Sequence, residues 1–295
     1  MIARKFELRR RLLGLIRFPP VRIILAAFWV GASIGLGSGL GALLPDAHKT
    51  LAPLFMAGGA LAGYYAFVRI FERRPVVEMT GPSWAREAVL GIVIGATLFG
   101  LVIAVLFILG NYQVDGVDAN SAVAATLVVA IMAGVTEEVL MRAVAFRILE
   151  EWLGSWAALV LTAVLFGALH LPNPQATWVS SAAIALEAGV MLAAAYMLTR
   201  RIWLPIGIHA AWNFTQSGIF GVATSGIEGK GYLKGSLHGS DFVSGGAFGP
   251  EASIVAVVIC TLLGVLLLVA AHRKGRFVAR GSSHASRRTA SLQCP

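Results

Sequence analysis

Charged residues are scarce in this sequence. Lys, Arg, Asp and Glu make up 13% of the 295 residues, whereas hydrophobic residues make up 57%. An ordinary soluble domain has about 25% charged residues. The shortage of charge excludes the soluble globular class and indicates an integral membrane protein.

Cysteine is nearly absent as well. The chain has two, Cys260 within an apolar run and Cys294 in a basic tail. That placement excludes a disulfide framework and a cysteine-based metal cluster. The helical zinc motif HExxH is missing, and the sequence has no internal repeat of the kind found in many transporters.

Long uncharged runs account for most of the chain. Each is near the roughly 20 residues that a helix needs to cross the hydrocarbon core of a bilayer. The runs are continuous rather than alternating, which favours helices over a barrel. We predict an all-α, polytopic membrane helical bundle with about eight transmembrane helices, over residues 23–44, 51–68, 88–110, 121–136, 152–171, 176–199 (interrupted by Glu187), 202–222 and 252–271.

Basic residues concentrate at both ends of the chain, which has a net charge of +9. Residues 1–22 hold seven Lys or Arg and one acid, and residues 272–295 hold six and no acid. Both termini are therefore predicted to be cytoplasmic, on either side of a bundle at 23–271. We interpret the basic ends as topology signals with weak attraction to anionic lipid, and we expect no nucleic-acid partner.

Ionisable residues inside these runs or directly at their ends are the exception that calls for a function, because each costs on the order of 3 kcal/mol at membrane depth. Glu138 and Arg142 are four residues apart, the favourable order for an ion pair on one helix face. Glu137 points about 100° away from Glu138 and is free for another role. We interpret the ion pair as structural support, and we expect the isolated Glu187 to pair with a buried arginine.

Two histidines repeat the same spacing in other runs. Phe166 and His170 are four residues apart, with a proline two residues further on, and His209 and Asn213 have the same spacing on the seventh predicted helix, without the proline. Each pair lies on one face of its helix. For His170 to reach Glu137, we expect its helix to stop at mid-depth at Pro172, with irregular backbone lining the site.

These residue types suit the hydrolysis of a peptide bond. A carboxylate in an apolar surround can take a proton from water, and a neighbouring imidazole can orient that water, so Glu137 and His170 fit a general base and its partner. His209 and Asn213 carry N–H donors suited to the negative charge that develops on an attacked carbonyl. Alternatively, Glu137, His170 and His209 match the ligand set of a catalytic zinc ion with one open position. The cofactor is thus either none or zinc.

Three motifs carry a family resemblance. Residues 137–142 (EEVLMR), 166–170 (FGALH) and 209–213 (HAAWN) resemble, in order, the EExxxR, FxxxH and HxxxN/B motifs of the CPBP intramembrane proteases, which include CAAX prenyl endopeptidases and bacteriocin-processing, Abi-like proteins. The resemblance spans a protease core at about residues 84–271. It implies an intramembrane endopeptidase of glutamic or metallo type, acting on a membrane-associated peptide or protein.

Within that resemblance, the family implies Glu137 as general base, His170 as its partner, and His209 with Asn213 as oxyanion donors. Glu138 and Arg142 would support them. We expect a multi-pass protein of the cell inner (plasma) membrane. Two alternatives stay open: a proton-coupled membrane transporter, in which the same Glu and His residues relay protons, and a non-catalytic bacteriocin immunity or scaffold protein.

Overall fold

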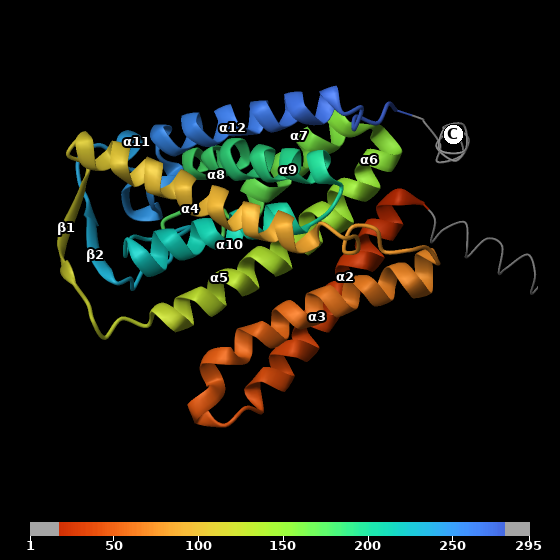
Figure 1. Ribbon diagram of the computed structural model, residues 1–295, viewed down its shortest axis with the longest axis horizontal. Coiled ribbons are helices and arrows are strands. Elements are labelled where there is room, and N and C mark those ends of the chain that lie inside the picture. The colour runs from red at the N-terminus through yellow and green to blue at the C-terminus, as the bar shows by residue number, and fades with distance from the viewer. Residues whose placement is uncertain (1–17, 281–295) are drawn as a thin grey trace, which may run out of the picture.

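A computed structural model describes residues 18–280 as a bundle of helices with one small two-stranded sheet (Figure 1). Helices are the expected outcome, because every backbone amide of an apolar run must be paired within the segment. The helices are α2 (Pro19–Ala42), η1 (Asp46–Leu51), α3 (Ala52–Phe67), η2 (Val68–Glu72), α4 (Trp84–Ile108), α5 (Val123–Glu138), η3 (Val139–Phe146), α6 (Arg147–Leu153), α7 (Ser155–Leu169), α8 (Trp178–Ile184), η4 (Ala185–Gly189), α9 (Val190–Thr199), α10 (Trp203–Asn213), η5 (Phe214–Ile219), α11 (Asp241–Ser244), η6 (Gly246–Phe248), η7 (Pro250–Ala252) and α12 (Ile254–Arg273).

All eight apolar runs form helices, which confirms the predicted fold class. In the described residues, however, six helical stretches rather than eight are long and apolar enough to cross a membrane. The run at 152–171 gives α7, whose 15 residues span about 22 Å and fall short of a hydrocarbon core of about 30 Å. The run at 202–222 gives α10 followed directly by the π-helical segment η5, with 11 and 6 residues.

The described ends of the chain, at the start of α2 and the end of α12, lie at the same end of the bundle (Figure 1). That arrangement fits an even number of crossings. Which side of the membrane this end faces stays a prediction. Residues 1–17 and 281–295, which include Cys294, lie outside the described residues. At the opposite end, β1 (Tyr112–Val117) pairs antiparallel with β2 (Leu233–Leu237). The Gly- and Ser-rich segment before α12 is thus held by a strand and a short helix rather than forming only a loop.

Glycines allow α4 and α10 to lie backbone against backbone. A Cβ added at Gly95 would overlap the carbonyl oxygen of Ile208, and one added at Gly207 would overlap that of Ala88. Gly91 and Gly95 are four residues apart on one face of α4, a spacing that lets a neighbouring backbone approach closely. Gly31 in α2 makes no such contact, because a Cβ there meets nothing within 4 Å.

Gly95→Ala is expected to destabilise the bundle by about 1–3 kcal/mol, because the added methyl must push α10 away from α4. The measurement is unfolding by SDS in mixed micelles. Gly100→Ala is the matched control, since the same change on the same helix meets no atom within 4 Å. Equal stability of the two variants would contradict the proposed tight contact.

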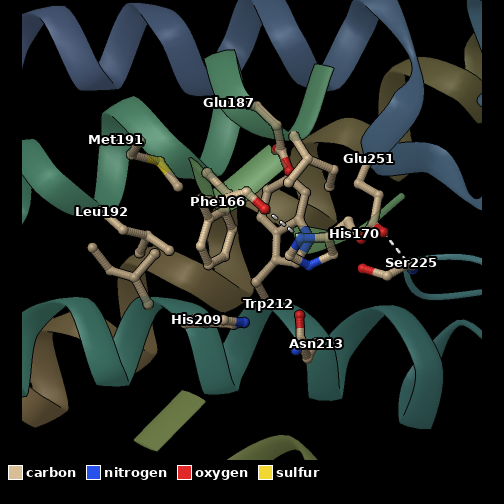
Figure 2. Close-up of a pocket in the computed structure, with 13 residues that line it drawn as sticks. Phe166, His170, Glu187, Met191, Leu192, His209, Trp212, Asn213, Ser225 and Glu251 are labelled. Atoms are coloured by element: carbon tan, nitrogen blue, oxygen red, sulfur yellow. Dashed lines mark hydrogen bonds between the residues drawn. The ribbon is translucent and has the colours of Figure 1, made fainter. Parts of the chain in front are cut away.

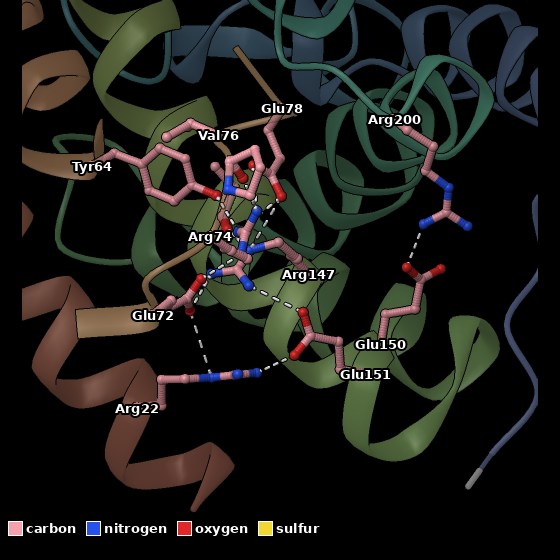
Figure 3. Close-up of polar contacts among 12 residues, drawn as sticks. Arg22, Tyr64, Glu72, Arg74, Val76, Glu78, Arg147, Glu150, Glu151 and Arg200 are labelled. Carbon is pink, nitrogen blue, oxygen red and sulfur yellow. Dashed lines mark hydrogen bonds and ion pairs between the residues drawn. The ribbon is translucent and has the colours of Figure 1, made fainter. Parts of the chain in front are cut away.

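A network of ion pairs ties the α2–α3 hairpin to the rest of the bundle (Figure 3). Its centre is the buried Arg147, whose guanidinium lies 2.7 Å from Glu72 and 3.0 Å from Glu151. Arg22 of α2 forms an ion pair with Glu151 as well, and Arg74 forms one with Glu72 at 2.7 Å. Arg22, which lies in the basic segment interpreted as a topology signal, is therefore paired with an acid. Arg200 with Glu150 and Arg201 with Glu87 form ion pairs as well.

Candidate active site

The carboxylate of Glu138 is buried completely and lies between Arg142 and His209. Arg142 Nη1 donates to Glu138 Oε1 over 2.9 Å, as the four-residue spacing predicted. From α10, His209 Nδ1 lies 3.0 Å from the same oxygen. Glu138 therefore fixes the orientation of His209 as well as pairing with Arg142, a link that the sequence did not reveal.

Arg142 is held in place by groups from other segments. Its Nη2 donates to the carbonyl oxygens of Ala188 at 3.1 Å and Gly189 at 3.3 Å, both in η4. Its Cζ lies 4.8 Å from the centre of the Phe166 ring, a cation–π distance. Arg142 lies in the π-helical segment η3, and the two carbonyl groups lie in the π-helical segment η4. Such segments occur frequently at functional sites.

Glu137 points to a different side of helix α5 from Glu138, as expected. Its Oε2 lies 3.9 Å from His209 Nε2, and 37% of its side chain is exposed. The distance is too long for a direct hydrogen bond but suits a bridging water. The described contacts join Glu137 to His209 rather than to His170, the partner predicted from the sequence.

His170 caps the carboxyl end of α7, where the predicted interruption is found. The chain leaves the helix after Leu169 and runs through irregular turns to Thr177. His170 Nδ1 lies 2.7 Å from the carbonyl oxygen of Phe166, so Nδ1 carries the proton and Nε2 is left as the free ring nitrogen. The ring packs against Phe166 with centroids 4.9 Å apart.

One cavity of about 30 Å³ brings three of the four predicted catalytic residues together. His209 and Asn213 reach it from α10, and His170 from the end of α7, with Phe166 between the helices (Figure 2). A volume of this size holds two or three water molecules, at roughly 10–15 Å³ each. Glu137 is not part of the cavity wall; it lies 3.9 Å from His209, which is.

Comparison with known proteins gave one match, to a family model. Residues 119–215 match the sequence model of the type II CAAX prenyl endopeptidase Rce1-like family. These residues form an Rce1-like domain. No curated protein and no solved structure matches the chain. The match confirms the resemblance to CPBP proteases and supports a CAAX-type endopeptidase within a membrane.

All seven predicted site residues lie inside the Rce1-like domain, which ends just beyond Asn213. The cavity wall extends further along the chain. Ser225 and Glu251 complete it from the segment that precedes α12, so the domain alone does not enclose the site. The motif residues thus lie within the matched region, and the rest of the cavity wall lies outside it.

Glu251 was missed in the sequence because it stands in a Gly-rich stretch with no motif spacing. Its side chain is 2% exposed and accepts a hydrogen bond from the backbone N–H of Ser225. Ser225 has φ +50°, a left-handed conformation that is uncommon for a residue with a Cβ. Burial raises the pKa of the Glu251 carboxyl, so the protonated form is favoured.

Glu187 lies on the opposite wall, in η4, and the expectation of an arginine partner was wrong. No described Lys or Arg pairs with it; its nearest polar neighbours are Cys260 of α12 and Glu251. The buried arginine of this region, Arg142, is already taken by Glu138 and two carbonyls. Arg142 therefore pairs with Glu138 and not with Glu187, a choice made by helix packing that local spacing cannot reveal.

The zinc alternative finds no ligand set in the described residues. No group of three or more His, Cys, Asp or Glu side chains there lies close enough together to hold a metal ion. Of the three predicted ligands, His209 presents one nitrogen to Glu138 and the other toward Glu137, while Nδ1 of His170 is occupied by the carbonyl oxygen of Phe166. Glu137, His170 and His209 therefore do not fit a zinc ion in this arrangement.

Proposed function

We propose that this protein is an intramembrane endopeptidase that hydrolyses peptide bonds of membrane-associated proteins or peptides. The observation that supports it most is the shared cavity of His170, His209 and Asn213, with Glu137 held 3.9 Å from His209. We propose a protease core at residues 84–271, since α4 packs along α10 and the segment before α12 supplies part of the wall.

Glu137 acts as the general base in this proposal. Water enters between the carboxylate and the ring nitrogens, and its proton passes to Glu137 as its oxygen attacks the carbonyl carbon of the substrate. His170 orients the water through Nε2, because its Nδ1 is committed to Phe166. Partial exposure of Glu137 keeps it reachable by water from outside the cavity.

His209 and Asn213 stabilise the oxyanion. Contact with Glu138 on one side and Glu137 on the other favours an imidazolium with a proton on both nitrogens. Its Nε2–H and the amide of Asn213 then donate to the negative oxygen of the tetrahedral intermediate. Collapse of that intermediate breaks the C–N bond, and the proton held by Glu137 moves to the leaving nitrogen.

The test is cleavage of membrane-spanning peptides by the purified protein in vesicles. Wild type is expected to cut, and His170→Ala is expected to lose at least about 100-fold in kcat/KM, the lower range for a general acid–base contribution. Glu228→Gln, which removes an exposed acid outside the cavity, is the control and should leave the rate unchanged. Because the predicted zinc ligands do not converge, a chelator is also expected to leave the rate unchanged.

The same vesicles separate the two rival functions. Proton-linked uptake without cleavage would support the transporter and overturn the protease. Neither activity, in protein that is folded by its unfolding profile, would support the non-catalytic immunity or scaffold role. The localisation in the plasma membrane is part of the proposal and is checked by fractionation of cells.

A further inference from the structure

Two carboxylates face the cavity from outside the catalytic set. Glu187 and Glu251 are each 2% exposed, and both form part of the wall that also holds His170 (Figure 2). They come from different segments, η4 and η7, and lie close enough to interact electrostatically. Among the described residues that form this wall, none is Lys or Arg, and the imidazoles of His170 and His209 are turned to the Phe166 carbonyl oxygen and to Glu138.

The two acids differ in how far local structure explains them. Glu251 accepts a hydrogen bond from Ser225 N and so anchors the turn at 224–227. Glu187 anchors no turn in this way. Its Oε2 is buried without a hydrogen-bond partner among the described residues, although its carboxylate is directed toward the other cavity residues (Figure 2). An unpartnered buried carboxylate oxygen is costly, on the order of 1–3 kcal/mol or more.

A positive ligand would remove that cost. Two buried carboxylates in one cavity do not both ionise unless a cation lies between them. The space of about 30 Å³ admits groups of the size of water, such as a primary ammonium, whereas the planar guanidinium of arginine is larger. Of the positive side chains of a peptide, lysine ends in the smallest charged group and suits this space better than arginine does.

We propose that Glu187 and Glu251 form a subsite that binds the ammonium of a lysine in the substrate, near the bond that is cut. The proposal rests on the proposed protease function and adds a substrate class to it. The subsite places a cationic side chain beside His170, so peptides with lysine at one position are cut faster than those without it.

The test compares peptides that carry Lys, Arg or Met at each of three positions on either side of the cut bond. All have acetylated amino termini and are presented in phosphatidylcholine vesicles, so lysine supplies the only primary ammonium of the peptide. Wild type is expected to show a Lys-to-Met ratio in kcat/KM of at least fivefold at one position, and a smaller ratio for Arg. Glu187→Gln is expected to reduce the Lys-to-Met ratio at that position at least fivefold, whereas the exposed Glu228→Gln leaves it unchanged.

The ratio is measured within one preparation and so does not depend on the fraction of folded protein. A wild-type ratio below fivefold at every position, or the same ratio in Glu187→Gln as in wild type, overturns the subsite while the protease function stands. Equal ratios for Lys and Arg contradict the argument from size. Absence of cleavage of every peptide overturns the proposed function, and the subsite with it.

Discussion

Glu137→Gln is expected to lower kcat/KM for peptide cleavage about a thousandfold, which corresponds to about 4 kcal/mol of transition-state stabilisation. Glutamine keeps the size of the side chain but cannot take the proton of the attacking water. The folded state should tolerate the change, because Glu137 is 37% exposed and has no close hydrogen bond to lose among the described residues.

Two further variants sharpen this prediction. Glu137→Asp keeps a carboxylate but withdraws it from His209, so its rate is expected to fall between those of wild type and Glu137→Gln. Glu228→Gln makes the same chemical change at an exposed position and serves as control. Activity of Glu137→Gln within tenfold of wild type, with an unchanged unfolding midpoint, would remove Glu137 from the role of base.

Arg142→Met is expected to destabilise the protein by about 3–5 kcal/mol, the usual cost of removing one partner from a buried ion pair. Glu138 is completely buried and would be left with His209 as its remaining polar partner among the described contacts. The carbonyls of Ala188 and Gly189 would also lose their donor. Unfolding by SDS in mixed micelles measures the change in the free energy of unfolding.

A double variant distinguishes an unpaired charge from a loss of packing. Arg142→Met combined with Glu138→Gln removes both charges and is expected to recover part of the lost stability, since no ionised group stays buried without its partner. Arg86→Met is the control, because Arg86 is exposed on α4. If the double variant is less stable than Arg142→Met alone, the ion pair is not the source of the effect.

Several features of the site could be predicted because they are local. The Glu138–Arg142 pair depends only on one helical turn, and the helix at Arg142 stays continuous even where it widens into η3. The end of α7 at His170 follows from Pro172, which cannot continue a helix. The contact of Phe166 with His170 is another four-residue spacing.

The sequence by itself determined the membrane class, the eight helical runs and the three motifs, because hydrophobicity and helical spacing act over a few residues. Only the tertiary structure decided that Glu137 lies beside His209 and that Glu187 and Glu251 line the same cavity. These neighbours are brought together by helix packing between segments far apart in the chain, as between α5 and α10 for Glu137 and His209. Such packing depends on glycine contacts, wide turns and competition among buried charges for one arginine, none of which has a signature in local spacing.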